Sequence, residues 1–255
     1  MVPSIDGKQL HFDNVGLYDA LFVMQDVETK TLWHHITGEA LYGSHVGRTL
    51  GPIGNLMQIN VEQALAMNTA TEIAISDRVY FAGGERFGTA TGLGPGANLA
   101  AAESMPPPRQ QARTAGPRIN ADMRLMNQFV STLADEDLRL PRMDVGLGIW
   151  AGSARRYYPM ESIREQGGAF IDAFDGKNML VFIDLDTYTP TALFVDAAGA
   201  TVEGKEIHFD NGSIFRSGML FDRDGVGRSP DRPQQLFTRW YGFALTFPGA
   251  EIFGQ

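Results

Sequence analysis

The chain has 255 residues, 44% hydrophobic and 20% charged, which is enough for a buried core and argues against disorder of the chain as a whole. Its formal net charge of −9 argues against a nucleic-acid-binding protein, which needs a basic face for phosphates. The absence of cysteine excludes disulfides, thiolate nucleophiles and zinc–sulfur or iron–sulfur sites.

The first half of the chain predicts strands, a short helix and a long connector. Residues 31–33 and 40–42 are rich in aromatic, apolar and β-branched types and predict two strands of a hairpin. Residues 61–67 predict a short helix, and residues 72–76 predict a strand. Repeated glycine and proline at residues 83–118 favour a connector that crosses the surface, with a functional lid as the alternative.

The middle of the chain predicts two helices and two buried strands. Residues 120–134 predict an amphipathic helix whose apolar side chains share one face and suit core packing. Residues 143–150 are apolar and glycine-rich and predict a buried strand. Residues 159–166 predict a short helix, and the apolar run at residues 179–183 predicts another buried strand.

The last part of the chain predicts a hairpin followed by a helix. Residues 191–195 predict a strand, and the turn residues at 197–199 lead into a further strand at residues 201–209. Residues 234–247 predict a helix with three packed aromatic residues, and the helix ends before Pro248-Gly249.

One motif occurs twice. The sequence Gly-Lys-Gln-Leu-His-Phe-Asp-Asn at residues 7–14 reappears as Gly-Lys-Glu-Ile-His-Phe-Asp-Asn at residues 204–211, with six of eight positions identical. Both copies predict strand, turn and strand, because Asp and Asn side chains bond to the local backbone in turns. A duplicated module and a recurrent hairpin without functional meaning are both open.

These elements predict an α+β protein dominated by antiparallel β-sheet. We expect two pseudo-repeated strand-hairpin modules, at about residues 7–77 and 140–253, each followed by a short helix. Residues 1–255 are expected to form a single compact domain, because neither half has a full set of strands.

Several segments follow one another along the chain in an order that is similar to that of a known bacterial family. They include Leu-Trp-His-His-Ile-Thr-Gly-Glu-Ala-Leu-Tyr-Gly at residues 32–43 and Phe-Thr-Arg-Trp-Tyr-Gly-Phe at residues 237–243. Over roughly residues 7–77 and 140–253 the chain resembles the bacterial family numbered 3179 among the domains of unknown function. The resemblance implies a β-rich, often exported protein and supplies no established activity.

The chain departs from this family at one segment. Many members have Cys-Pro-Leu-Cys just before the Thr-Ala-Leu strand, where this chain has Asp-Thr-Tyr-Thr at residues 186–189. If that segment does redox or metal work in the relatives, this protein does not do it in the same way.

The histidines form the first candidate site. His34, His35 and His45 fall within twelve residues, with Glu39 between them. Imidazole suits several divalent transition metals, so these three histidines are the predicted metal ligands. Neighbouring residues of a regular strand point to opposite faces, so we expect only one of His34 and His35 to join His45. Surface or hydrogen-bonded histidines are the alternative.

The carboxylates form the second candidate site. Asp184 and Asp186 close a buried strand, and alternation places both on one face. Two close carboxylates can bind a cation or divide acid and base roles, and turn capping is the alternative. The predicted catalytic residues are Asp184, Glu39 and His35.

Two classes of function are open. The first is a metal-dependent or hydrolytic enzyme that uses this cluster of His, Glu and Asp side chains with a divalent transition metal. The second is a non-catalytic binding or assembly protein of the bacterial cell envelope. A small-molecule ligand and a homo-oligomer fit either class.

No apolar run is long enough to span a bilayer, and the first residues lack the pattern of a signal peptide. We therefore expect a periplasmic or extracellular protein if an export signal has been removed, and a cytoplasmic one otherwise.

Overall fold

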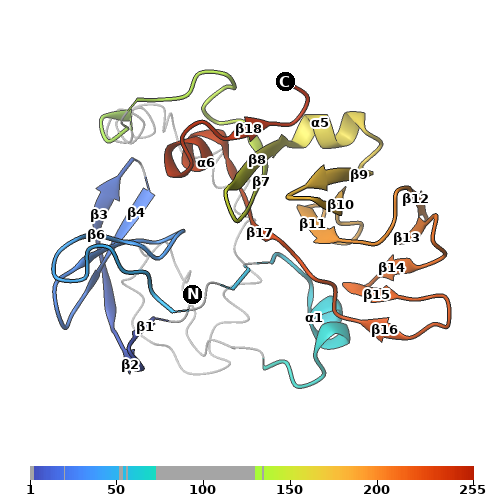
Figure 1. Ribbon diagram of the computed structural model, residues 1–255, viewed down its shortest axis with the longest axis horizontal. Coiled ribbons are helices and arrows are strands. Elements are labelled where there is room, and N and C mark those ends of the chain that lie inside the picture. Colours follow the sequence, from blue (N-terminus) through green and yellow to red (C-terminus); the bar gives the residue numbers. More distant parts are fainter. Residues whose placement is uncertain (1–2, 20, 52–53, 56, 73–129, 134) are drawn as a thin grey trace, which may run out of the picture. The chain divides into compact units, whose positions relative to one another are not determined.

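The computed structural model describes residues 3–19, 21–51, 54–55, 57–72, 130–133 and 135–255. There the chain is mostly antiparallel β-sheet with a few short helices, as predicted (Figure 1). Residues 1–69 and 129–255 belong to one unit, and the single-domain prediction for the whole chain stays a prediction. The strand expected at residues 72–76, the connector and the helix at residues 120–134 lie wholly or mostly outside the described residues.

The N-terminal region contains a two-stranded and a four-stranded antiparallel sheet. The first pairs β1 (Ser4–Ile5) with β2 (Lys8–Gln9). The second has the order β3 (Phe12–Tyr18), β4 (Leu21–Asp26), β5 (Leu32–His34) and β6 (Ala40–Tyr42), which confirms the predicted hairpin at residues 31–42. One hydrophobic core cluster of this region contains the buried residues Ile5, Leu10, Trp33, Ala40 and Leu50.

The central sheet has the order β11 (Pro190–Phe194), β10 (Lys177–Ile183) and β9 (Ala169–Phe174). Strand β10 is buried on both faces because its apolar residues are consecutive. Alternation places Leu180 and Phe182 in one core cluster and Met179 and Val181 in another. The predicted buried strand at residues 179–183 is therefore confirmed as the strand between two cores.

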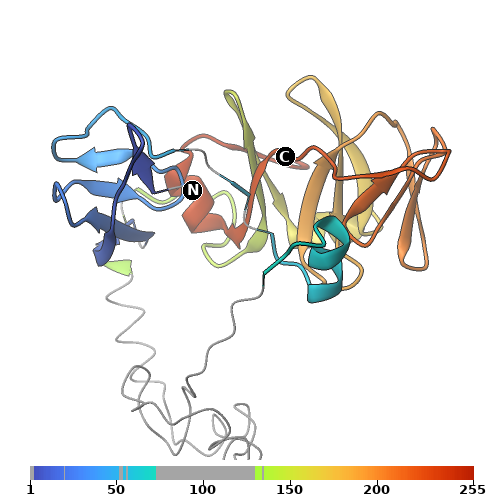
Figure 2. The ribbon, with the colours of Figure 1, turned by 90° about the horizontal axis from the view of Figure 1, so that it is seen from below.

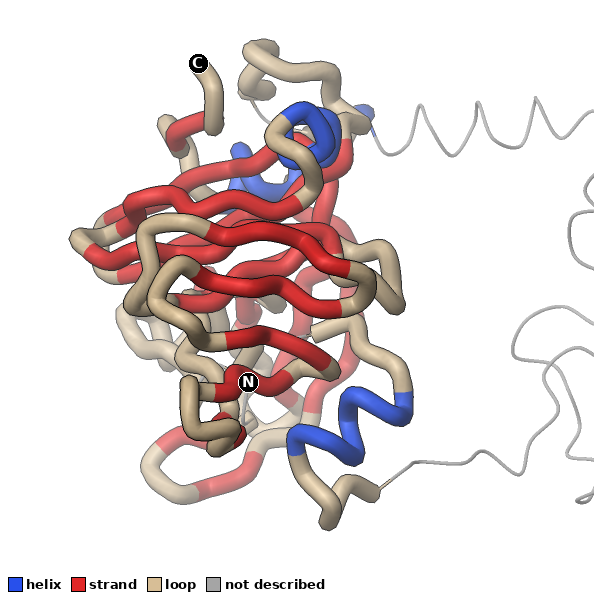
Figure 3. The backbone as a smooth tube through the Cα atoms, turned by 90° about the vertical axis from the view of Figure 1, so that its right-hand side faces the viewer, coloured by secondary structure: helices blue, strands red, loops and turns tan. Residues whose placement is uncertain are grey.

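One of these cores lies under a five-stranded antiparallel sheet. Its order is β12 (Ala200–Glu203), β13 (Glu206–Phe209), β14 (Ile214–Arg216), β15 (Met219–Phe221) and β16 (Gly227–Arg228). Figure 3 shows these strands side by side, with a helix next to them. That helix is α1 (Val61–Met67), as predicted (Figure 2). Its Met67 side chain lies close to Gly218 in the β14–β15 turn.

The second core is shared with a sheet of order β17 (Gln234–Arg239), β7 (Val145–Ala151), β8 (Ala154–Pro159) and β18 (Glu251–Ile252). Helices α5 (Met160–Glu165) and α6 (Trp240–Thr246) flank its strands in sequence. A Cβ atom at Gly148 of β7 would stand 2.1 Å from the Phe243 ring, so only glycine lets α6 pack this closely. The glycine-rich strand expected at residues 143–150 and the helix expected at residues 159–166 are confirmed.

Two predicted elements are wrong in part. Residues 234–239, expected to begin a helix, form strand β17 and pair with β7, and only residues 240–246 are helical. The aromatic residues have helical spacing, but the first of them lies in the strand and the others lie in the helix. Pairing with β7 therefore decides the structure of residues 234–239 against the local pattern. Residues 201–209 form two strands, because Gly204 turns the chain between β12 and β13 with a φ of 62°.

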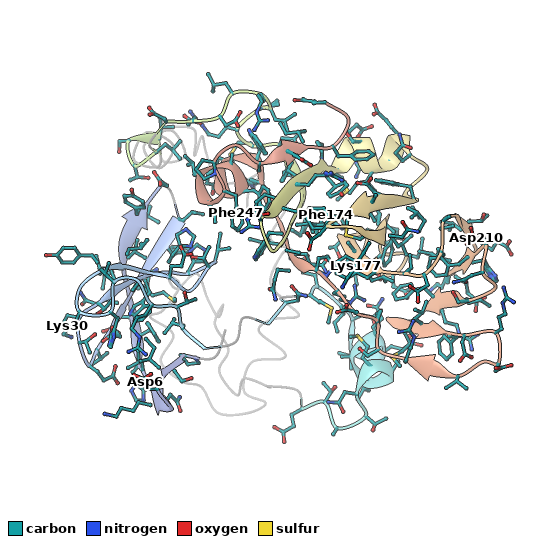
Figure 4. The ribbon with its side chains drawn as sticks, viewed as in Figure 1. Asp6, Lys30, Phe174, Lys177, Asp210 and Phe247 are labelled. Atoms are coloured by element: carbon teal, nitrogen blue, oxygen red, sulfur yellow. The ribbon has the colours of Figure 1, made fainter. Side chains whose placement is uncertain are left out.

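The two motif copies differ in local structure, so the pseudo-repeated modules are not confirmed. In the second copy, Asp210 and Asn211 form the predicted turn after β13, and Figure 4 labels Asp210. In the first copy, Asp13 and Asn14 lie inside β3 and pair with β4, so the predicted turn there is wrong. What the copies share is a left-handed glycine at the turn before the motif's first strand, Gly7 with a φ of 76° and Gly204 with 62°.

Candidate functional site

Asp184 begins the tight turn that connects β10 to β11. Its main-chain N–H donates to the carbonyl oxygen of Thr189 at 2.8 Å. Its Oδ1 accepts from the main-chain N–H groups of Asp186 and Thr187, at 3.0 and 2.8 Å, and from the Thr187 hydroxyl at 3.0 Å. The side chain is therefore a turn cap, the alternative that the sequence left open, and its catalytic role stays a prediction.

The neighbouring carboxylate has a different partner. Asp186 forms an ion pair with Lys205, with Oδ1 and Nζ 2.6 Å apart. The carboxylate Oδ2 of Asp184 instead accepts from Gln63. The two carboxylates thus have separate partners in the described structure, although the sequence places them two residues apart.

Gln63 joins Asp184 to α1. Its Nε2 donates to Asp184 Oδ2 at 2.9 Å, and the side chain is only 2% exposed. Its Oε1 accepts from the main-chain N–H of Asn60 at 3.0 Å, while Asn60 Oδ1 accepts from the Gln63 N–H at 2.8 Å. This capping box starts α1, so one carboxamide both begins the helix and fixes it to the β10–β11 turn.

The chain before α1 is fixed to the same region. Asn55 donates from Nδ2 to the carbonyl oxygen of Pro233 at 2.8 Å, and its Oδ1 accepts from the main-chain N–H of Gln235 at 3.0 Å. The Thr189 hydroxyl donates to the carbonyl oxygen of Gln58 at 3.4 Å. The described residues 55 and 57–63 therefore lie across the β10–β11 turn and the start of β17.

These elements enclose a cavity of about 50 Å³. Its polar wall includes Gln63, Asp184, Thr189, Thr191, Arg232 and Gln235. Its apolar wall includes Ile59, Leu147, Phe215, Leu236 and Phe237. A water molecule needs at least ~10–15 Å³ of such space, so the cavity has room for about four non-hydrogen atoms.

Arg232 is the unusual member of the polar wall. Its Nη1 donates to the Thr191 hydroxyl at 3.1 Å and to the carbonyl oxygen of Ala192 at 3.0 Å. Its Nε is inaccessible to solvent and has no hydrogen-bond partner among the described residues. Burial lowers the pKa of Arg232 to about 10, although the Asp184 carboxylate favours the charged form.

Gln235 fixes the other side of this wall. Its Oε1 accepts from the main-chain N–H of Ala192 at 2.7 Å, and its Nε2 donates to the carbonyl oxygen of Ala192 at 3.0 Å. The carboxamide therefore satisfies both main-chain groups of a strand residue, as a further strand would. The main-chain N–H of Phe194 donates to Asp231 at 2.8 Å, so residues 231–235 follow the edge of β11 and hold Arg232 at the cavity.

The structure brings two of the predicted histidines together. The rings of His34 and His35 are stacked, with centroids 5.7 Å apart and planes 8° apart. The expectation that they point to opposite faces is wrong, because β5 ends at His34 and alternation stops there. His34 Nδ1 accepts from the main-chain N–H groups of Ile36 and Thr37, at 3.2 and 3.3 Å.

These contacts set the protonation of the pair. Burial, assisted by the neighbouring His35, lowers the pKa of His34 to about 4. Burial also lowers the pKa of His35, although its hydrogen bond from Nδ1 to the Phe22 carbonyl oxygen, at 2.8 Å, has the opposite effect. Both imidazoles are therefore neutral near pH 7.

His45 and Glu39 have other surroundings. The His45 ring lies 5.7 Å from the Trp33 ring, and Glu39 forms a main-chain bridge with Thr49. Within the described ranges, no group of three His, Asp or Glu side chains is arranged to hold a metal ion. The metal ligands His34, His35 and His45, and the catalytic roles of His35 and Glu39, stay predictions without a converging geometry.

The sequence did not single out Gln63, Arg232 or Gln235. The turn at Asp184 does have a sequence signal, because Asp-x-x-Thr-x-Thr occurs at both residues 26–31 and 184–189. No local signal marks Arg232, whose role depends on contacts with β11 and the cavity.

The comparisons with known proteins add no relative. No protein-family model, no curated protein and no solved structure matches the chain. Of the helices in the described residues, none is long and apolar enough to cross a membrane. The resemblance to the family numbered 3179 therefore stays a prediction from the motifs at residues 32–43 and 237–243.

Proposed function

We propose that this protein is a non-catalytic binding protein that holds a small molecule in the cavity beside α1. The observation that supports this most directly is the lining of the cavity, which combines the guanidinium of Arg232 and the carboxamides of Gln63 and Gln235 with apolar side chains.

The lining side chains favour binding over catalysis. Gln63 and Gln235 are carboxamides, which orient a ligand but do not exchange protons near pH 7. Asp184, the carboxylate of the described wall, already accepts four hydrogen bonds, which leaves it poorly placed as a general base. The same lining is typical of ligand sites, with an apolar wall and a few polar groups.

The test is ligand-observed NMR with the full chain and a panel of small neutral, anionic and cationic molecules. Leu236→Phe adds volume at the cavity wall, and Leu138→Phe makes the same change at a residue that is 82% exposed. We expect at least one molecule to bind the native protein and the Leu138→Phe variant, and to bind the Leu236→Phe variant at least about tenfold more weakly. If no molecule of the panel binds, or if Leu236→Phe leaves binding unchanged, the proposal is wrong.

A further inference from the structure

We propose that helix α1 is a lid over the cavity, and that the hydrogen bond between Gln63 and Asp184 is the latch that holds it closed. This inference rests on the binding function proposed above and adds how access to that site is controlled. A ligand enters when residues 57–67 move away, and it is enclosed when the latch forms again. Three observations support the lid: the polar contact face of α1, the completeness of each side of the latch, and the place of the segment in the cavity wall.

The first observation is that a polar side chain docks α1. Of the seven residues of the helix, Gln63 is the one that is buried, at 2% exposed. Val61 and Leu65, an apolar pair one turn apart, are 53% and 41% exposed, and Met67 near Gly218 is partly buried. A permanently docked helix buries an apolar stripe, because apolar burial is the main force that holds elements together. Helix α1 buries little apolar surface, so it loses little when it moves away.

The second observation is that each side of the latch is complete without the other. Oδ1 of Asp184 accepts from Asp186 and Thr187, so the β10–β11 turn stays capped when α1 leaves. Gln63 and Asn60 form the capping box within the segment itself, so α1 keeps its first turn. The bond from Gln63 Nε2 to Asp184 Oδ2, at 2.9 Å, connects the two sides. Water that enters on opening replaces both partners, which lowers the cost of breaking this bond.

The third observation is the place of the segment in the wall. Residues 57–59 and Gln63 form one side of the cavity, and its other lining residues lie between residues 147 and 237. Those residues lie in or near strands that pair with one another in sheets. Moving them breaks main-chain pairing, whereas moving α1 breaks none. The segment that contains α1 is therefore the side of the cavity that opens at the lowest cost.

The segment is held firmly at its start. The Asn55 carboxamide donates to the carbonyl oxygen of Pro233 at 2.8 Å and accepts from the Gln235 N–H at 3.0 Å. Further along, the bond from the Thr189 hydroxyl to the carbonyl oxygen of Gln58 is long, at 3.4 Å. Asn55 is thus the fixed end of the segment, and the latch closes the moving end.

The experiment measures how readily the cavity opens. The chain has no cysteine, so a single introduced thiol reports the exposure of its own site through its rate of reaction with a small thiol reagent. Leu147→Cys places the thiol in the cavity wall, and Leu180→Cys places it in the core under the five-stranded sheet. The two native side chains are 1% and 0% exposed, so the variants are matched.

Each rate is compared with the rate that global unfolding of the same variant allows, as measured by urea denaturation of the full chain. We expect Leu147→Cys to react at least about tenfold faster than its global unfolding allows, because the lid opens locally. Leu180→Cys should react no faster than global unfolding allows.

Three substitutions in the Leu147→Cys background test the latch. Gln63→Ala removes the donor to Asp184, so the thiol should react at least about tenfold faster. Asp184→Asn leaves the capping box intact but replaces the accepting oxygen with a donor, so it should have a similar effect. Leu65→Ala truncates an apolar side chain on the exposed face and keeps a good helix former, so it should change the rate by less than about threefold. A helix held mainly by apolar contacts would show the opposite order.

If Leu147→Cys does not fold, hydrogen exchange of the native chain decides the question. The Ala64 N–H donates to the carbonyl oxygen of Asn60 within α1, and the Val181 N–H belongs to β10. Exchange at Ala64 should be nearly independent of urea below the unfolding transition, while exchange at Val181 should accelerate with urea. The same urea dependence at both amides would show that α1 opens only with the whole protein, and the lid would be wrong.

The outcomes separate the lid from the binding function. If both thiols react only as fast as global unfolding allows, or if Leu65→Ala accelerates the reaction as much as Gln63→Ala, the lid is wrong whatever the ligand panel shows. Fast reaction of Leu147→Cys, accelerated by Gln63→Ala, supports the lid even when no panel molecule binds. In that case the lid stands and the proposed binding function is wrong.

Discussion

Two turns with the same sequence pattern have different partners. Asp-x-x-Thr-x-Thr connects β4 to β5 at residues 26–31 and β10 to β11 at residues 184–189. In both, the aspartate N–H donates to the last threonine, and the next-to-last residue is left-handed, Lys30 with a φ of 60° and Tyr188 with 57° (Figure 4 labels Lys30). In both, the first threonine donates from its hydroxyl to the aspartate.

The difference is the partner of the second carboxylate oxygen. Oδ2 of Asp26 accepts from Nε1 of Trp33 at 2.8 Å, within the same hairpin and its own core. Oδ2 of Asp184 accepts from Gln63, which is far away in sequence and begins α1. The same local turn therefore completes a core in one place and closes a cavity wall in the other. A local motif fixes the turn, and the long-range partner decides whether it belongs to a site.

The largest expected effect comes from removing either carboxylate. Asp26→Ala and Asp184→Ala each leave several buried donors without an acceptor, so each should lower the free energy of unfolding by about 2–4 kcal/mol. Urea denaturation measures both losses. Only Asp184→Ala should also move the NMR resonances of the Gln63 side chain. The proposed difference between the two turns is wrong if Asp26→Ala moves the Gln63 resonances equally, or if either variant is as stable as the native protein.

A smaller loss of stability is expected when only the partner of Asp184 Oδ2 is changed. Gln63→Glu retains an acceptor for the capping box but places a carboxylate against Asp184, and should lower the free energy of unfolding at pH 7 by about 2 kcal/mol. Burial and Asp184 raise the folded-state pKa of the introduced carboxyl above its unfolded value. The variant is therefore most stable, relative to the native protein, below pH of about 4.3, and it loses stability as pH rises through the raised pKa.

Trp33→Phe is the matched change at the other turn. It removes the N–H that donates to Asp26 but introduces no ionisable group, so its loss of stability should not share this pH dependence. Urea denaturation of both variants between pH 4 and pH 8 separates them. Equal pH profiles for the two variants would show that Gln63 does not face Asp184 in solution.

The sequence predicted the elements that depend on local pattern. The apolar run of β10 and the helix at residues 61–67 follow directly from residue order, and both are present. Residues 234–239 were predicted as helix because pairing with β7 is not visible in a local window. The sequence also picked Asp184 from its place at the end of a buried strand. It missed Gln63 and Arg232, because their roles come from contacts between segments distant in the chain.

The smallest expected effect tests whether the two turns are equivalent. Lys30→Gly and Tyr188→Gly each relieve a left-handed residue at an exposed position, at the cost of a more flexible unfolded chain. The relief of backbone strain and the added flexibility of the unfolded chain nearly cancel. Each variant should therefore gain about 0.5 kcal/mol or less in the free energy of unfolding, and the two gains should agree. Thermal denaturation of both variants measures this. A clear loss for Tyr188→Gly alone would mean that the Tyr188 ring, although 77% exposed, stabilises the turn beside the cavity, and the two turns would then differ beyond the partner of one oxygen.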